Sequence, residues 1–274
     1  MKTLITGGSG MIGSALRNIL PDALYIDSKY CDLRSSIHTE ELFKSFSPDY
    51  VIHLAAKVGG VKANQNNLGE FYYDNILINT NVLESSKKCK VKKVVSLLST
   101  CIYPDKVSYP LTEEQIHLGE PHHSNYGYAY AKRMLDVQSR AYRENHGCNF
   151  ITAVPNNLYG EHDNFHLEDS HLIPAIIRKV YESKIYNSAV NLWGNGSPLR
   201  EFTYSYDLAK ILLFLLENYD DPSPINVGNT NEYSVREVCD KISKIFDFNG
   251  IINWDESKPT GQYKKPSSNS KLIK

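Results

Sequence analysis

The chain has 274 residues, of which 41% are hydrophobic and 22% are charged, and this length is enough to bury the core of one large domain or of two closely packed ones. Its 30 Lys and Arg residues against 31 Asp and Glu residues give a formal net charge of -1, which argues against nucleic acid and anionic membranes as partners. The longest apolar run, ILLFLL from Ile211 to Leu216, is too short to span a bilayer, and the first strand follows Met1 and Lys2 at once. We therefore expect no secretory leader and a cytoplasmic location.

Short apolar runs alternate with helical patterns through the first half of the chain. Strands are predicted over residues 2–6, 23–27 and 49–55, with helices over 11–20 and 37–46 between them. The alternation continues with a helix over 68–89, a strand over 91–99, a loop over 100–124, a helix over 128–146 and a strand over 150–155. This order predicts an α/β fold with a doubly wound parallel sheet of the Rossmann type, covered by helices on both faces.

The rhythm breaks after Pro155. A loop over 156–170 precedes a predicted helix over 171–184, a short strand over 190–194 and a further helix over 234–246. We expect residues 1–160 to form a dinucleotide-binding domain, with parts of 200–230 returning to it, and residues 161–274 to form mainly a smaller, partly interleaved substrate lobe. The last residues, 258–274, are polar and rich in Lys and Ser, which predicts an unordered tail.

A glycine-rich turn joins the first predicted strand to the first predicted helix. Gly7, Gly10 and Gly13 have the spacing GxxGxxG, and Asp27 closes the second strand 20 residues after Gly7. Glycines in such a turn let a pyrophosphate approach the N–H groups at the start of a helix. The weaker alternative is a tight turn whose glycines serve packing alone. The residues predicted to hold the dinucleotide here are Gly7, Gly8, Ser9, Gly10, Met11, Ile12 and Gly13.

Tyr128 and Lys132 lie four residues apart in the segment YGYAYAK, so both side chains project from one face of a helix. An ammonium beside a phenol favours the phenolate, which predicts a tyrosine pKa lowered from about 10 towards the working pH, as proton exchange with a carbonyl requires. Ser99, at the end of a predicted strand, could donate to the same oxygen. The alternative is a chance pairing, because the chain has 19 tyrosines.

Six segments together resemble the extended short-chain dehydrogenase/reductases, and among them the enzymes that form GDP-L-fucose. The resemblance runs from the N-terminus to about Lys271, and it implies a Rossmann domain, a smaller nucleotide-sugar domain and a homodimer. It also implies 3,5-epimerisation of GDP-4-keto-6-deoxy-D-mannose followed by NADPH-dependent reduction of the 4-keto group. The glycine loop and YxxxK indicate only the superfamily, whereas STCIYP, HDNF and SHLIP indicate the subfamily that forms GDP-L-fucose. The segments are GGSGMIG, HLAAKVGG, LSTCIYP, YGYAYAK, NLYGEHDNF and SHLIPAI.

The resemblance implies roles for five catalytic residues. Epimerisation beside a ketone needs a base on one face and an acid on the other, and the family's pair matches Cys101 and His171. Tyr128 would donate the proton in the reduction, Lys132 would hold the nicotinamide ribose, and Ser99 would bind the ketone oxygen. Without the motifs, Cys101 would be interpreted as a small buried cysteine and His171 as an ordinary residue at a helix N-terminus.

Binding residues follow from the same resemblance. The nicotinamide side of the cofactor would contact Leu97, Leu98, Tyr128, Lys132, Pro155, Asn156, Asn157, Leu158 and His171. The sugar nucleotide would contact Asn157, Lys179, Trp193, Arg200, Thr260 and Lys265. Cations suit a diphosphate and an indole offers a flat apolar surface. Taken singly these assignments are weak, since lysines are usually solvated and Trp193 could belong to the core, and Thr260 replaces the acidic residue usual in the family.

The cofactor prediction depends on residues 27–29. A carboxylate at Asp27 accepts bonds from a ribose 2′-hydroxyl and repels a 2′-phosphate, which favours NAD. The family resemblance implies NADPH, and Ser28 and Lys29 could bind the 2′-phosphate if Asp27 points away. We therefore predict NADP(H), with NAD as the alternative.

Other functions are weaker interpretations of the same residues. His162, Asp163, His166 and His171 suggest a metal site, but the segment lacks an HExxH motif and has the pattern of a loop, so no metal is expected. The five cysteines are odd in number and form no CxxC pair, which argues against a zinc site or disulfide framework. A related 4-epimerase or 4,6-dehydratase is disfavoured by Cys101, and a nonenzymatic dinucleotide sensor is disfavoured by the intact Ser99, Tyr128 and Lys132.

Overall fold

A six-stranded parallel sheet forms the centre of the computed structural model, which describes residues 2–167, 170–258 and 262–274. Each neighbouring pair of strands is parallel, which confirms the predicted α/β class. The order across the sheet is β2 (Leu24–Ile26), β1 (Thr3–Thr6), β3 (Tyr50–His53), β4 (Lys93–Leu97), β5 (Phe150–Pro155) and β9 (Ile225–Val227).

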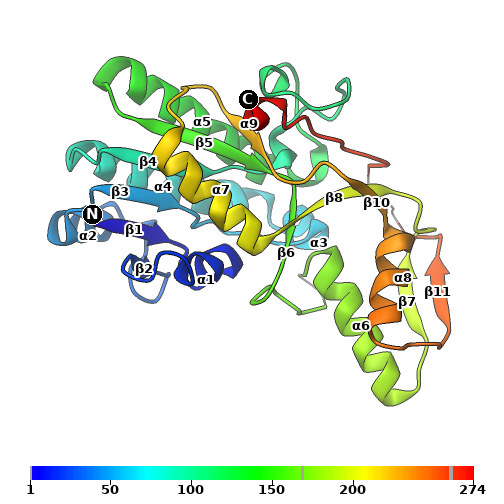
Figure 1. Cartoon of the computed structure of the whole chain (residues 1–274). Coiled ribbons are helices and arrows are strands. Elements are labelled where there is room, and N and C mark those ends of the chain that lie inside the picture. The colour runs from blue at the N-terminus through cyan, green and yellow to red at the C-terminus, as the bar shows by residue number, and fades with distance from the viewer. Residues whose placement is uncertain (1, 168–169, 259–261) are drawn as a thin grey trace.

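Helices cover both faces of this sheet, as a doubly wound fold requires (Figure 1). Successive strand residues point to opposite faces, so Leu4 joins one apolar cluster and Ile5 the other. The Leu4 face packs against α2 (Ser36–Phe46), α4 (Leu68–Lys88) and α5 (Tyr126–His146). The Ile5 face packs against α1 (Met11–Arg17) and α7 (Ser205–Asn218). Because α7 leads into β9, residues late in the chain complete the sheet beside β5.

A smaller lobe lies beyond one end of the sheet (Figure 1). Its apolar cluster, which includes Ile176, Val180 and Phe202, is separate from the two clusters of the large sheet. A three-stranded sheet has the order β10 (Glu232–Ser234), β8 (Leu199–Tyr204) and β6 (Asn157–Tyr159). The other elements of this lobe are α6 (Leu172–Tyr186), β7 (Val190–Trp193), α8 (Val235–Ile245) and β11 (Ile252–Asp255).

The remaining elements are short. They are α3 (Val61–Asn66), the 3-10 turns η1 (Thr100–Ile102), η2 (Glu113–Gln115) and η3 (His123–Asn125), and α9 (Ser270–Ile273). No helix in the described ranges is long and apolar enough to cross a membrane.

The prediction of an unordered tail is wrong for residues 262–274. Leu111 N donates a hydrogen bond to Pro266 O at 2.8 Å, and Ser268 N donates one to Leu111 O at 2.9 Å. Leu272, in α9, packs on the apolar cluster of the Ile5 face. The polar composition of this segment is compatible with order because its backbone groups are paired with a distant loop.

Candidate functional site

The glycine turn connects the end of β1 to the start of α1. Gly10 is the N-cap residue of α1. Gly7 has a φ of +70°, and a Cβ on it would lie 2.9 Å from Ala55 N. A Cβ on Gly13 would lie 2.6 Å from Gly7 O. Both positions therefore require glycine, and the turn keeps a bare backbone at the carboxyl end of β1, where parallel sheets of this type bind dinucleotides.

Asp27 follows β2 and takes part in the turn after it. Its Oδ1 accepts hydrogen bonds from Lys29 N at 3.0 Å and Tyr30 N at 3.1 Å. Ser28 and Lys29 are exposed at this turn. One carboxylate oxygen is therefore engaged in capping the local backbone, and two exposed polar side chains stand beside it.

Tyr128 and Lys132 lie one turn apart on α5, and Lys132 contacts the end of β4. Lys132 is only 2% exposed, and its Nζ donates to Leu97 O at 2.8 Å. The same Nζ lies 5.9 Å from the centroid of the Tyr128 ring. A Cβ on Gly127 would lie 2.3 Å from Leu68 O, so glycine lets the first turn of α5 approach the start of α4 and fixes where Tyr128 stands.

The pKa values of this pair differ from the prediction. Burial raises the pKa of Tyr128 above its ordinary value, with a smaller contribution from the nearby Cys101. Burial also lowers the pKa of Lys132 to about 8. The expected lowering of the tyrosine pKa by Lys132 is therefore not found in the chain alone, because desolvation of the phenolate is the dominant effect.

Ser99 and Cys101 stand directly after β4, at the turn η1. The Ser99 side chain caps this turn and accepts from Cys101 N at 3.4 Å. Burial raises the pKa of the Cys101 thiol, whereas Ser99, Lys265 and Lys132 all lower it. The structure thus brings Ser99, Cys101, Tyr128 and Lys132 together and adds the ammonium of Lys265 to them.

The predicted nicotinamide contacts come from the ends of two neighbouring strands. Leu97 and Leu98 are buried at the end of β4. Pro155 ends β5, and Asn157 and Leu158 belong to β6. Asn156, between β5 and β6, is 8% exposed, and its Oδ1 accepts from Thr203 Oγ1 at 2.7 Å. Asn156 Nδ2 also donates to Asn229 O at 2.7 Å, so this side chain ties the segment between β5 and β6 to two other parts of the chain.

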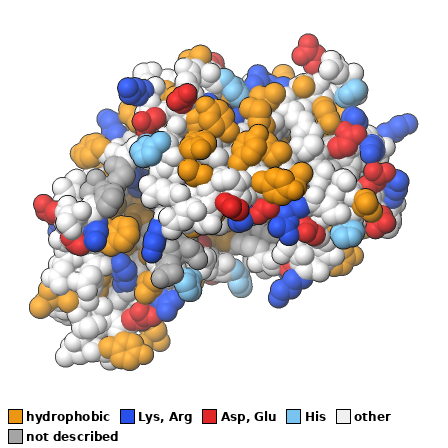
Figure 2. All heavy atoms as spheres, turned by 180° about the vertical axis from the view of Figure 1, so that it is seen from behind, with side chains coloured by type: hydrophobic (Ala, Val, Ile, Leu, Met, Phe, Trp, Pro, Cys, Tyr) orange, Lys and Arg blue, Asp and Glu red, His pale blue; other side chains and the backbone are white. Residues whose placement is uncertain are grey.

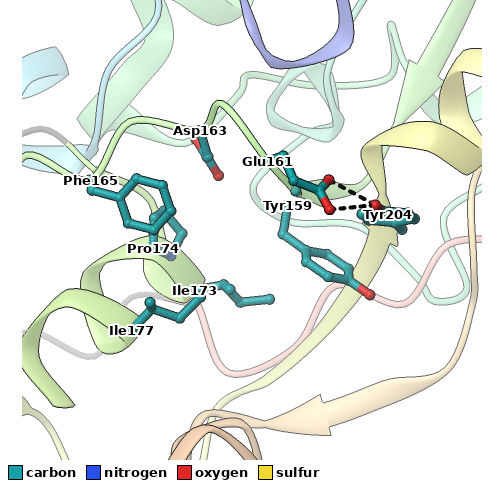
Figure 3. Close-up of a pocket in the computed structure, with 9 residues that line it drawn as sticks. Tyr159, Glu161, Asp163, Phe165, Ile173, Pro174, Ile177 and Tyr204 are labelled. Carbon is teal, nitrogen blue, oxygen red and sulfur yellow. Dashed lines mark hydrogen bonds between the residues drawn. The ribbon is translucent and has the colours of Figure 1, made fainter. Parts of the chain in front are cut away.

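His171 is the N-cap residue of α6, in the smaller lobe, and it is exposed. It interacts electrostatically with Asp163. Asp163 Oδ2 is buried and has no hydrogen-bond partner among the described residues, and burial raises the pKa of this carboxyl. Figure 3 shows Asp163 beside a pocket between β6 and the first turns of α6, with Phe165, Ile173 and Ile177 around it. The pocket has a volume of about 280 Å³.

The predicted sugar-nucleotide residues divide into two groups. Lys179 donates from Nζ to Asn191 O at 2.8 Å, and Trp193, on β7, is 58% exposed. Arg200 and Lys265 interact electrostatically, and burial lowers the pKa of each. Thr260 lies outside the described residues.

Sequence reasoning missed Glu201, whose buried carboxylate contacts both Asn156 and Ser267. The available signal was a carboxylate directly before Phe202 in the segment LREFTY over 199–204. Within the part of the chain that the structure describes, no cluster of three or more His, Cys, Asp or Glu side chains could hold a metal ion.

Comparison with known proteins identifies a family and several similar proteins. The profile of the NAD dependent epimerase/dehydratase family matches residues 3–228. A GDP-L-fucose synthase from Dictyostelium discoideum is 46% identical over 278 residues, which is 98% of this chain and 87% of that protein. A probable GDP-L-fucose synthase from Drosophila melanogaster is 42% identical and covers 99% of this chain and 89% of its own length.

A solved structure is similar over nearly the whole chain. The crystal structure of a GDP-L-fucose synthetase from Naegleria fowleri bound to NADP superposes with a TM-score of 0.94 at 42% identity. The match covers 99% of this chain and 85% of that chain.

Proposed function

The chain belongs to the NAD dependent epimerase/dehydratase family, and from that premise we propose that it converts GDP-4-keto-6-deoxy-D-mannose to GDP-L-fucose by 3,5-epimerisation and 4-keto reduction. Its GDP-L-fucose synthase relatives support this reaction. The observation that carries the proposal is the set Ser99, Cys101, Tyr128 and Lys132, gathered at the end of β4. A thiol beside the reductase set supplies a group that ketone reduction alone does not need.

The residues at the strand ends fit a dinucleotide cofactor. The glycine turn leaves a bare backbone where side chains at Gly7 and Gly13 would clash, and Lys132 has N–H donors beyond the one given to Leu97 O. Gly7 to Gly13 would hold the pyrophosphate, and Lys132 the nicotinamide ribose. When bound, NADPH supplies a hydride to carbon 4 of the sugar. The NADP-bound relative supports this choice of cofactor.

Asp27 is compatible with a 2′-phosphate in this proposal. Its Oδ1 caps the backbone N–H groups of Lys29 and Tyr30, which directs part of its charge into the turn. The exposed Ser28 and Lys29 would then bind the phosphate.

Epimerisation is assigned to Cys101 and His171. The Cys101 thiolate would remove the proton from carbon 3 or carbon 5, which lie beside the ketone, and His171 would return a proton to the opposite face. The charge that develops on the 4-keto oxygen would be stabilised by the hydroxyl groups of Ser99 and Tyr128. Burial raises the pKa of Cys101 and favours the neutral thiol in the free chain, and Lys265 and Lys132 act against this effect by lowering the same pKa.

Reduction is assigned to Tyr128, which would give its phenolic proton to the oxygen at carbon 4. Burial keeps this phenol protonated in the free chain, so the proton to be transferred is in place, although the raised pKa makes the phenol a weaker acid. The Lys132 ammonium would stabilise the phenolate left after the transfer. Ser99 would hold the same oxygen in place.

The cofactor and the sugar nucleotide would bind to different parts of the chain. We assign the cofactor to residues 1–160 together with α7 and β9, which join the large sheet. The rest of 161–274 would bind mainly the sugar nucleotide, through Asn157 at the boundary and Lys179, Trp193, Arg200 and Lys265. The cysteines at positions 31, 89, 101, 148 and 239 are free thiols, which supports a cytoplasmic location.

A homodimer formed through α4 and α5 is the proposed assembly. Figure 2 shows hydrophobic side chains gathered on the face opposite to the one seen in Figure 1. A groove of about 420 Å³ between α4 and α5 is lined by Leu68, Gly69, Tyr72, Tyr126, Gly127, Tyr130 and Met134. Tyr72, Tyr126 and Val137 are 44%, 47% and 40% exposed. A contiguous exposed apolar face of this kind marks an interaction site. In a twofold dimer, this face of one chain would contact the same face of the other chain.

The dimer is tested by sedimentation equilibrium at micromolar concentration. We expect the mass of two chains for the unaltered protein and the mass of one chain for Met134→Glu. The matched control Ile185→Glu changes an exposed apolar residue on α6, far from this face in sequence and lobe, and it should remain dimeric. A single-chain mass for the unaltered protein would contradict the proposal.

The proposed reaction is tested by incubation of the chain with GDP-4-keto-6-deoxy-D-mannose and either NADPH or NADH. We expect GDP-L-fucose as the product, identified by NMR, and a rate at least about tenfold higher with NADPH, because one charged contact to the 2′-phosphate is worth that much. A different deoxysugar would support a related epimerase or reductase. If the chain binds NADPH but turns over no substrate, the result would support a nonenzymatic dinucleotide sensor. Faster turnover with NADH than with NADPH would reject the cofactor assignment.

A further inference from the structure

Residues 262–268, here called the C-terminal strap, cross from the smaller lobe to the large sheet. Leu199 N, in β8, donates to Tyr263 O at 2.8 Å. Asn226 Nδ2, in β9, donates to Ser268 O at 3.1 Å. Between these ends the strap pairs with Leu111 on the loop that follows Cys101. Figure 1 shows the strap in red, running from the region of β10 towards α9.

One buried carboxylate holds the strap near its C-terminal end. Glu201, in β8, is 2% exposed. Its Oε1 accepts from Ser267 N at 2.8 Å, and its Oε2 accepts from Ser267 Oγ at 2.5 Å. The same Oε2 accepts from Asn156 Nδ2 at 3.2 Å. A single side chain thus joins the strap to the segment between β5 and β6, and hydrogen bonds to a buried charged acceptor are among the stronger ones in proteins.

Lys265 stands two residues before this attachment point. Its ammonium interacts electrostatically with Cys101, Asp105 and Arg200, so the strap places a cation next to the proposed base and the proposed diphosphate ligand. Gln262, at the other end of the strap, donates from Nε2 to Asp105 Oδ1 at 2.7 Å. The position of Lys265 therefore depends on how the strap is fixed on both sides of it.

We propose that Glu201 is a positioning residue of the reaction, because its carboxylate fixes Ser267 and thereby holds Lys265 beside Cys101 and the sugar-nucleotide diphosphate. Glu201 touches neither the substrate nor the cofactor in this proposal. The inference rests on the proposed function for its effect on turnover, but the attachment of the strap can be measured without turnover.

Glu201→Gln is the informative substitution. A glutamine keeps the shape of the side chain and one carbonyl oxygen, which can still accept from Ser267 N. Its amide nitrogen cannot accept from Asn156 Nδ2 or Ser267 Oγ, so the buried network loses at least one bond without leaving a cavity. Glu217→Gln, at an exposed position on α7, is the matched control. Ser267→Ala removes only the hydroxyl bond and serves as a milder second variant if Glu201→Gln is unstable.

The kinetic test is a double-mutant cycle with Lys265→Met. For Glu201→Gln alone we expect the KM for the sugar nucleotide to rise about tenfold, with the KM for NADPH changed by less than about twofold. In the Lys265→Met background, Glu201→Gln should change the KM for the sugar nucleotide by less than about twofold, because its action passes through Lys265. The proposal would be overturned if the two substitutions raised the KM for the sugar nucleotide independently, so that their factors multiplied in the double variant. It would also be overturned if Glu201→Gln raised the KM for NADPH as much as the KM for the sugar nucleotide.

Amide hydrogen exchange separates this inference from the proposed function. In the free chain we expect the amides of residues 262–268 to exchange at least about tenfold faster in Glu201→Gln than in the unaltered protein or in Glu217→Gln. Unchanged exchange would reject the attachment even if the unaltered chain makes GDP-L-fucose. If the unaltered chain makes no GDP-L-fucose, the proposed function fails, whereas faster exchange would still establish the attachment by Glu201.

Discussion

Cys101→Ser is expected to slow proton exchange at carbons 3 and 5 by about 10³-fold, while the reduction of an already epimerised 4-keto sugar stays within about twofold. A serine hydroxyl has nearly the size of the thiol but a much higher pKa, so it is a poor base. The backbone contact from residue 101 to Ser99 Oγ is kept, and a serine hydroxyl can replace the thiol in its side-chain hydrogen bond with Ser99. The loss should therefore fall on epimerisation alone.

The two steps can be measured separately. Deuterium incorporation at carbons 3 and 5 in D₂O without NADPH reports epimerisation, and NADPH oxidation with the epimerised ketone reports reduction. Cys148→Ser is the matched control, since Cys148 is a half-buried free thiol that packs on the core beside α5. Equal losses of exchange and reduction in Cys101→Ser would show that Cys101 is not the base.

Tyr128→Phe is expected to have the complementary effect. Removing the phenolic hydroxyl takes away the proposed proton donor, so reduction of the epimerised ketone should fall by about 10³-fold. Proton exchange at carbons 3 and 5 should fall by less than about tenfold, because Ser99 still donates to the ketone oxygen. Single-turnover oxidation of NADPH measures the reduction, and deuterium incorporation measures the exchange.

Tyr130→Phe, two residues further along α5, is the control for this substitution. Its ring lies over the Arg133 guanidinium, with 5.4 Å between the guanidinium carbon and the ring centroid, and that contact needs no hydroxyl. This control should reduce the epimerised ketone at the rate of the unaltered protein. Reduction by Tyr128→Phe at a near-normal rate would refute the assignment of the proton donor.

The parts of the site that sequence predicts are those set by local spacing. The GxxGxxG turn between a strand and a helix and the four-residue separation of Tyr128 and Lys132 are properties of neighbouring residues. Both appear in the structure at the ends of the large sheet. The apolar runs likewise predict the parallel strands, because a strand covered on both faces consists mainly of apolar residues.

The parts that sequence does not predict depend on contacts between distant segments. The helix α5 begins at Tyr126 rather than Tyr128, where Gly127 meets the backbone of Leu68. The strap is ordered by Leu111 and Glu201, which lie far from it in the chain. The raised pKa of Tyr128 comes from desolvation, which only the packed structure determines. Hydropathy and spacing carry no information on these pairings.

The late arrival of β9 beside β5 bears on how the molecule is made. Ala153 is paired with Ile225, and Pro155 with Val227, so one flank of β5 lies open until the ribosome has released more than 70 further residues. During that interval β5 is an unpaired edge strand of the nascent chain, and such strands are prone to pair with other molecules. Detaching the first 160 residues as a separate fragment would make this temporary exposure permanent.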